Sequence, residues 1–225
     1  MKQHIALALD VPSADEALEL VQATRDSVGV YKVGMQLFYA EGPALVQRIK
    51  ALGCQVFLDL KLHDIPNTVA SALRSLRPLG VDFVTLHAGG GPAMLRAAAA
   101  EAGAMRLLAV TVLTSMDEVQ LRATGVAEAP GAQVARLARM AADSGVPGLV
   151  CSPQEAAMLR AELGEEAFLV CPGIRPAGAD VGDQVRIATP AKAIADGANL
   201  LVIGRPIRTA DDPGAAARAI LESLS

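Results

Sequence analysis

The stretch DLKLHDIPNTV, residues 59–69, places two acids and a lysine within six residues at the end of an apolar strand pattern. Successive side chains of a strand point to opposite faces, so Asp59 and Lys61 share one face of a strand predicted over 55–61. A lysine beside carboxylates stays a charged ammonium, which can stabilise developing negative charge and deliver a proton. The spacing therefore predicts electrostatic catalysis with a built-in proton donor.

Charged side chains occur in the two preceding strand patterns as well. In IALALD, residues 5–10, Asp10 shares a face with the two small alanines, and in GVYKVG, residues 29–34, Lys32 lies opposite its apolar neighbours. Each charge has a structural explanation on its own, as a strand end, a surface lysine or an ion pair. A set of four buried charges is expensive to desolvate and weak as a stabilising network. We therefore interpret the whole set as functional: Asp10, Lys32, Asp59 and Lys61.

Eight short apolar runs alternate with helical patterns, and several of the helical patterns end in glycine, a common C-terminal stop. Repeated β-then-α units predict an α/β fold, a closed (β/α)8 TIM barrel, formed as one domain over residues 1–225. The alternative is an open doubly wound sheet, which usually shows a G-x-G-x-x-G turn after its first strand, whereas DVPSADEA contains no glycine. The strands are predicted at 5–10, 29–34, 55–61, 81–87, 106–113, 148–152, 167–173 and 199–204.

The carboxyl ends of barrel strands form the mouth that holds active sites, and the four charges are expected to converge there. PGIRP and IGRPI follow the seventh and eighth predicted strands, where barrels commonly bind phosphate. Gly173 and Gly204 allow close backbone approach, and Arg205 offers a bidentate fork, although a surface charge is the alternative explanation for a single arginine. The glycine-rich stretch 177–184 is predicted to be a lid that closes over the phosphate.

Composition excludes several classes of function. The net charge is −4, aromatic residues make up 3% and there is no tryptophan, which argues against a nucleic-acid-binding surface. The three cysteines and three histidines show no metal-ligand spacing, so we expect no metal site. No apolar run approaches the roughly 20 residues of a membrane span, and the start lacks a signal-peptide pattern. We therefore expect a soluble cytoplasmic protein.

Three polar residues near the charged stretch have more than one explanation. Asp64 either takes part in the charge array or caps a helix in which Pro66 is the first residue. His63 alternates away from Lys61, so a structural role is favoured for it. His87 is predicted on the inward face of its strand, and we assign it no chemistry.

DLKLHDIPNTV resembles the D-x-K-x-x-D signature of orotidine 5′-monophosphate decarboxylases. Seven other blocks resemble the same family, in the same order and along essentially the whole chain: LALDV, YKVG, LHAGGG, VTVLTSM, CPGIRP, GDQVRIATPAKAI and LVIGRPI. The chain is also similar to the magnesium-dependent 3-keto-L-gulonate 6-phosphate decarboxylases and hexulose-phosphate synthases. Those relatives carry an acid at the position of Lys32, and they lack the HDIPNT continuation and the long GIRPAGADVGDQVRI loop.

The resemblance implies a free-standing, cofactor-independent lyase that converts orotidine 5′-monophosphate (OMP) to UMP and CO2 in pyrimidine biosynthesis. It implies a homodimer with shared active sites, in which a lysine protonates a carbanion at C6 of the pyrimidine. The implied catalytic array is Lys32, Asp59, Lys61 (the proton donor) and Asp64, the last supplied, with Thr68, by the other subunit. The implied ribose ligands are Asp10 and Lys32, and the implied pyrimidine contact is Thr114. The implied phosphate ligands are Arg175, Gln184, Gly204 and Arg205.

Two other functions remain open on the sequence. One is a magnesium-dependent sugar-phosphate decarboxylase or aldolase of the same superfamily, which a chelator test would separate from a cofactor-free enzyme. The other is a non-catalytic nucleotide-phosphate sensor on the same barrel. A sensor has no need of a proton donor, so the lysine and aspartate array argues against it.

Overall fold

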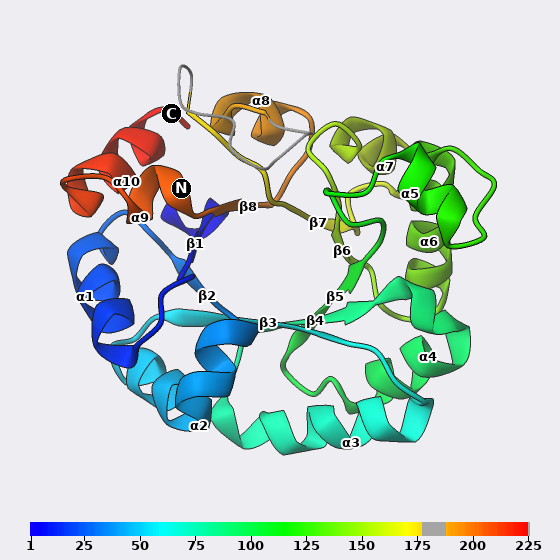
Figure 1. Cartoon of the computed structure of the whole chain (residues 1–225), viewed down its shortest axis with the longest axis horizontal. Helices are drawn as coiled ribbons and strands as arrows, with labels where there is room; N and C mark the ends of the chain where they lie inside the picture. The colour runs from blue at the N-terminus through cyan, green and yellow to red at the C-terminus, as the bar shows by residue number, and fades with distance from the viewer. Residues whose placement is uncertain (177–187, 225) are drawn as a thin grey trace.

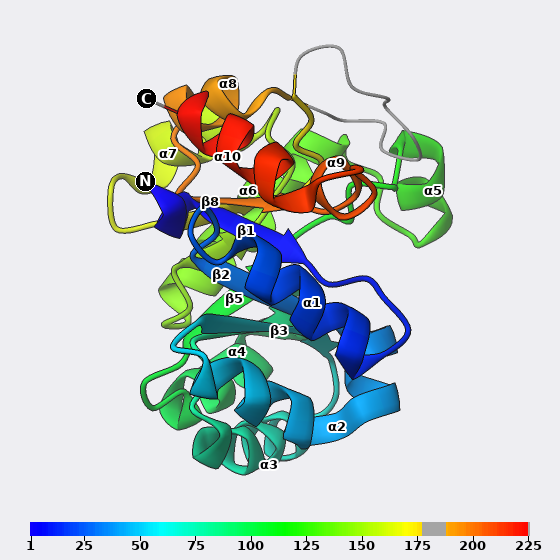
Figure 2. The same cartoon turned by 90° about the vertical axis from the view of Figure 1, so that its left-hand side faces the viewer.

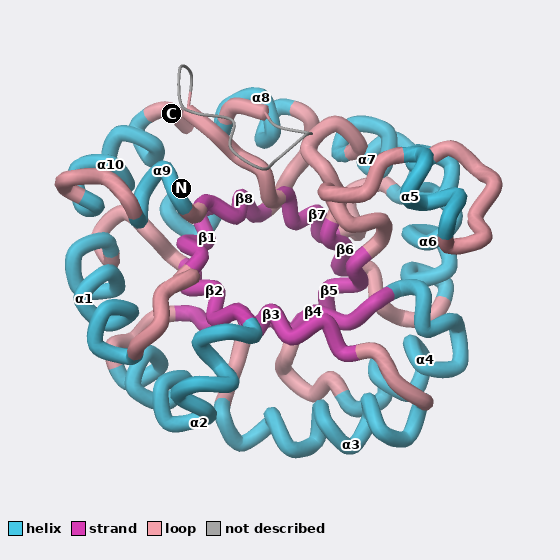
Figure 3. The backbone as a smooth tube through the Cα atoms, viewed as in Figure 1, coloured by secondary structure: helices cyan, strands magenta, loops and turns pink. Residues whose placement is uncertain are grey.

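The computed structural model describes residues 1–176 and 188–224, and it shows eight parallel strands closed into a barrel (Figures 1 and 3). Each strand pairs with the next one in the sequence, and Ile5 opposite Leu201 closes the ring between the last strand and the first. The predicted (β/α)8 barrel is confirmed. Its strands are β1 (Ile5–Ala8), β2 (Val30–Gly34), β3 (Gln55–Leu62), β4 (Phe83–His87), β5 (Arg106–Val110), β6 (Gly148–Val150), β7 (Phe168–Cys171) and β8 (Leu200–Ile203).

Helices form the outer layer around the strands (Figure 2). Side chains cap several of them; the side chain of Ser13, for example, accepts a hydrogen bond from the N–H of Glu16 at the start of α1. Within the described residues, no helix has the length and apolar character needed to span a membrane. The helices are α1 (Ala14–Thr24), α2 (Met35–Ala51), α3 (Pro66–Leu76), α4 (Gly91–Glu101), α5 (Glu118–Ala123), α6 (Pro130–Asp143), α7 (Ala156–Leu163), α8 (Pro190–Ala195), α9 (Arg205–Arg208) and α10 (Pro213–Glu222), with short 3-10 turns η1 (Lys2–His4), η2 (Arg77–Leu79) and η3 (Ala88–Gly90).

The strands separate two apolar cores. Ile5, Leu7 and Leu9 pack in the larger core between the strands and the helices. The alternating small residues Ala6 and Ala8 face the interior of the barrel, as predicted. The interior is filled by Ala6, Ala8, Val30, Phe57, Phe83, Leu108, Val170, Leu200 and Val202. A charged residue that continues an inward-facing series therefore projects into the barrel mouth.

β3 departs from regular pairing where it carries its charged residues. Leu58 pairs with Val84 and Leu62 pairs with Leu86, so three residues of β3 (59–61) lie opposite one residue of β4. We call residues 59–61 the β3 bulge. A bulge bends a strand and redirects its side chains, and this one lies at the barrel mouth.

Candidate active site

Asp59 lies between two lysines at the carboxyl end of the barrel. Its Oδ1 atom is 2.8 Å from Nζ of Lys61, and its Oδ2 atom is 3.5 Å from Nζ of Lys32. Lys32 also donates a hydrogen bond to Oδ1 of Asp10, at 3.2 Å. The structure therefore brings together the four charged residues that strand alternation predicts on the inward face.

The side chains of this ion-pair array are buried to different extents, and burial affects the ionisation of Asp59. The side chains of Lys32 and Asp59 are 11% and 15% exposed, whereas that of Asp10 is 53% exposed. Burial opposes the ionisation of Asp59, but the two neighbouring ammonium groups, together with hydrogen bonds from Lys61 and Thr85, outweigh it. The pKa of Asp59 therefore lies below its ordinary value, and Asp59 is a carboxylate at neutral pH.

A cavity of about 440 Å³ opens at this end of the barrel, within the usual size of a small-molecule site. Its polar lining comes from two groups of strands. The segments at β1 to β3 contribute Asp10, Lys32, Asp59 and Lys61. The segments after β7 and β8 contribute Gly173, Arg175, Gly204, Arg205 and Arg208. Apolar residues that include Phe57, Val110, Val170 and Val202 complete the wall.

The segments after β7 and β8 concentrate positive charge on one part of the cavity wall. Gly173 has a φ of 78°, a left-handed conformation that favours glycine and turns the chain sharply after β7. Arg175 is buried, and its Nη1 donates a hydrogen bond to the carbonyl oxygen of Ile174 at 2.9 Å. Arg205 is the first residue of α9. Guanidinium groups bind phosphate and carboxylate well, so this wall suits an anionic group of a ligand.

Arg208 is a cavity residue that the sequence analysis did not identify. It is the last residue of α9, and it lines the same wall as Arg205. Its Nε atom is buried and makes no hydrogen bond with any described residue. The repeated arginine in RPIR was the available signal, but the short helix that orients it was not predicted.

A family model described as "Orotidine 5′-phosphate decarboxylase / HUMPS family" matches residues 3–220. The chain belongs to this family. An "Orotidine 5′-phosphate decarboxylase" of Anaeromyxobacter sp. (strain K) is 53% identical over 223 residues, covering 99% of this chain and 98% of the relative. One of Thermobifida fusca (strain YX) is 52% identical over 225 residues, covering 100% of this chain and 97% of the relative. The crystal structure of orotidine 5′-phosphate decarboxylase from Lactobacillus acidophilus matches with a TM-score of 0.87 at 37% identity, covering 98% of each chain.

The resemblance to orotidine 5′-monophosphate decarboxylases implies three further ligand residues, two of which lie in the described part of the chain. Thr68 is exposed in the first turn of α3, and Thr114 is half-buried after β5. Neither is among the described residues that line the cavity. Gln184 and the predicted lid at 177–184 lie outside the described residues.

Asp64, the last member of the D-x-K-x-x-D signature, is exposed beyond the end of β3. The helix-cap explanation for it is wrong, because α3 begins at Pro66 with Ile65 as its N-cap and has no side-chain cap. The Asp64 carboxylate instead accepts a hydrogen bond from the N–H of Ile65, at 2.7 Å. Within the described part of this chain, Asp64 forms no ion pair with Lys32 or Lys61.

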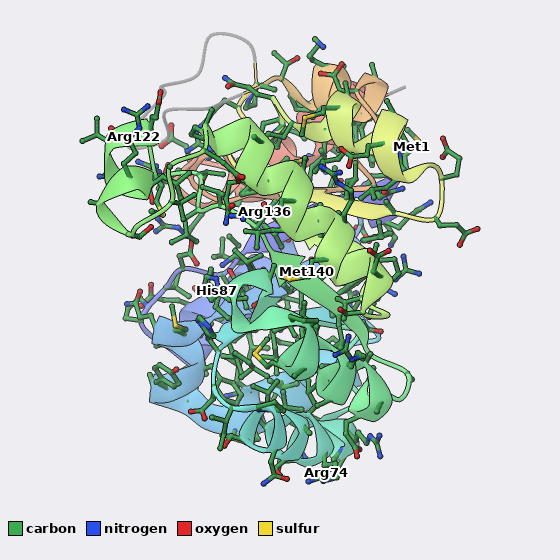
Figure 4. The ribbon with its side chains drawn as sticks, turned by 90° about the vertical axis from the view of Figure 1, so that its right-hand side faces the viewer. Met1, Arg74, His87, Arg122, Arg136 and Met140 are labelled. Carbon is green, nitrogen blue, oxygen red and sulfur yellow. The ribbon has the colours of Figure 1, made fainter. Side chains whose placement is uncertain are left out.

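His63 and His87 form a pair beside the charge array, with ring centroids 5.4 Å apart. Figure 4 shows His87 toward the same end of the barrel as Arg122 of α5, far from Met1. Burial lowers the pKa of His87, and the nearby His63 and Lys61 lower it further. His87 is therefore a neutral imidazole at pH 7. His63 is exposed just beyond the end of β3, and the structural role that strand alternation favours for it stays a prediction.

Proposed function

We propose that this chain decarboxylates OMP to UMP and CO2. The observation that carries the proposal is the carboxylate of Asp59 held between the ammonium groups of Lys32 and Lys61 in the wall of the cavity of about 440 Å³. Relatives that are 53% and 52% identical to this chain are named orotidine 5′-phosphate decarboxylase, which supports the same reaction. The predicted magnesium-dependent alternative requires an acid where the chain has Lys32.

The chemistry of decarboxylation explains why such an array is needed. The bond between C6 and the carboxylate breaks, CO2 leaves, and the electron pair stays on C6 in the plane of the pyrimidine ring. The ammonium of Lys61 stabilises this negative charge and transfers a proton to C6, and Lys61 then regains a proton from water. Asp59 holds the ammonium in place through the 2.8 Å contact. In this assignment Lys32 and Asp10 bind the ribose hydroxyls.

The direct test is to add OMP to the metal-free protein, follow the loss of orotate absorbance and identify UMP as the product. Stoichiometric UMP formation over many turnovers supports the proposal. Binding of OMP without turnover would instead support the phosphate sensor. We also expect the enzyme to act in the cytoplasm.

Removing divalent metal is expected to leave the activity unchanged. Among the described residues, no group of three or more His, Cys, Asp and Glu side chains is placed to hold a metal ion. Turnover is measured after exhaustive chelation and again after magnesium is returned. Activity that disappears with the chelator and returns with magnesium would favour the sugar-phosphate alternative.

The substrate phosphate is assigned to the arginine-rich wall, with Arg205 as its main side-chain ligand. Arg205→Ala is expected to weaken OMP binding by about 1.5–3 kcal/mol, the value of a charge-assisted hydrogen bond, and to change kcat less. Steady-state kinetics with OMP measures both effects. The matched control is Arg218→Ala, which removes an exposed arginine of α10 that does not line the cavity.

A substrate without phosphate separates this assignment from a general loss of function. Orotidine offers Arg205 no phosphate, so wild type and Arg205→Ala are expected to have similar low activity on it. If the variant loses as much activity on orotidine as on OMP, Arg205 is not the phosphate ligand.

The active site is proposed to be completed by a second subunit. In its own chain Asp64 is exposed and accepts a hydrogen bond from the N–H of Ile65, a residue that is itself 66% exposed. Tyr39 and Met35 of α2, which follow the neighbouring strand β2, are 74% and 42% exposed. Exposed apolar residues around a barrel mouth are explained by an interface that covers them. In the proposed homodimer, each subunit donates Asp64 and Thr68 to the site of its partner.

A further inference from the structure

Thr85 of β4 is hydrogen-bonded to two residues of the charge array, Asp59 and Lys61. Its side chain is buried, with 1% of the residue exposed. Its Oγ1 atom accepts a hydrogen bond from the backbone N–H of Lys61 at 2.9 Å, and it donates one to Oδ1 of Asp59 at 3.0 Å. Thr85 has no part in the decarboxylation steps proposed for Asp59 and Lys61.

The directions of these two hydrogen bonds follow from the groups involved. A backbone N–H can only donate, so the threonine oxygen must accept from Lys61. The carboxylate of Asp59 can only accept, so the hydroxyl proton of Thr85 points to Oδ1. One hydroxyl group therefore connects the backbone of the proton donor to the side chain of its anionic partner.

The hydrogen bond to Thr85 holds Lys61 at a point where its backbone has an uncommon conformation. Lys61 has a φ of 50°, and it is the only residue other than glycine with a positive φ in the part of the chain that the structure describes. Left-handed conformations are uncommon for such residues and persist where the surrounding structure holds them. Lys61 lies in the β3 bulge, and its N–H donates to the side-chain hydroxyl of Thr85 on the neighbouring strand β4.

The carboxylate of Asp59 is oriented by the same contact. Oδ1 accepts from both Lys61 and Thr85, while Oδ2 faces Lys32 at 3.5 Å. Two of these three partners are long lysine side chains with many rotamers. Thr85 is the short, rotamer-restricted partner, because its branched side chain is packed in a strand.

We propose that Thr85 is a positioning residue, which holds the carboxylate of Asp59 and the strained backbone of Lys61 in the relative geometry that proton transfer requires. The identity of the reaction rests on the proposed function, whereas the hydrogen-bond geometry does not.

Two substitutions separate the hydroxyl from the shape of the side chain. Thr85→Val keeps the branched shape and removes both hydrogen bonds, and Thr85→Ser keeps the hydroxyl. Thr85→Val is expected to lower kcat roughly 10²-fold, the cost of misplacing a catalytic group by about 1 Å. KM is expected to change much less, because the phosphate contacts are intact. Thr85→Ser is expected to retain most of the wild-type kcat.

Thr24→Val is the matched control for the loss of a buried threonine hydroxyl. Thr24 is also 1% exposed, and its Oγ1 donates to the carbonyl oxygen of Leu20 at 2.7 Å and lies 3.0 Å from the hydroxyl of Tyr31. This control is expected to lower the melting temperature and leave kcat unchanged. A wild-type kcat for Thr85→Val, or an equal loss for Thr85→Ser, would overturn the positioning role.

A second measurement does not depend on turnover. The hydrogen bond from Thr85 helps to lower the pKa of Asp59, so Thr85→Val should raise that pKa, and Thr85→Ser and Thr24→Val should not. Carbon-13 NMR of the Asp59 carboxyl group in the ligand-free protein measures it. An unchanged pKa in Thr85→Val would refute the inference. A raised pKa in a protein whose wild type does not convert OMP would support the geometry and refute only the proposed function.

Discussion

Lys61→Ala is expected to lower the decarboxylation rate by about 10⁴-fold or more, because it removes both the proton donor and the charge that stabilises the carbanion. Affinity for UMP is expected to stay close to that of the wild type. The proposed phosphate and ribose contacts of the nucleotide come from other residues, among them Arg205 and Asp10. Single-turnover rates with OMP and a titration with UMP measure the two effects separately.

Lys50→Ala is the matched control for the loss of a lysine–aspartate pair. Nζ of Lys50 is 2.8 Å from Oδ2 of Asp82, the same distance as in the pair of Lys61 with Asp59. The lysine side chains are similarly exposed, at 30% and 27%, but Lys50 does not line the cavity. Lys50→Ala should therefore keep its activity. Near-normal turnover by Lys61→Ala would rule out Lys61 as the proton donor.

The residues that meet at the barrel mouth could be predicted, because the face of the sheet to which a strand residue points depends only on its position along that strand. Asp10 follows two small residues that fill the interior, and Asp59 follows Phe57 on the same inward series. Once eight strands close into a ring, the ends of all such series meet at one mouth. Periodicity and element order were enough for this part of the site.

The parts of the site that sequence did not reveal depend on contacts between elements. Residues 59–61 read as regular strand, and the left-handed backbone of Lys61 follows from pairing with β4 across the bulge. The role of Thr85 follows from the same pairing. Arg208 was missed because α9 has only four residues, too few to show a helical period. The place of Asp64 was left open because it lies on a loop after β3, where strand alternation no longer applies.

Co-refolding Lys61→Ala with Asp64→Ala is expected to restore about a quarter of wild-type activity, although each variant alone is nearly inactive. In the proposed dimer, each site combines the Lys61 of one subunit with the Asp64 of the other. One site of a mixed dimer then receives Lys61 from the Asp64→Ala chain and Asp64 from the Lys61→Ala chain, so it is complete. The other site carries both defects. The variants are unfolded and refolded together in equal amounts, and OMP turnover is measured.

The expected recovery follows from random pairing, which makes about half of the dimers mixed, each with one complete site of two. The control is a mixture of Lys61→Ala with Asp59→Ala. Asp59 and Lys61 form their 2.8 Å ion pair within one chain, so no pairing of these two variants builds an intact array. Recovery in the first mixture and none in the second is the signature of a site shared across the interface. If mixed dimers of Lys61→Ala and Asp64→Ala form but are no more active than their parents, Asp64 does not serve the site of the neighbouring subunit.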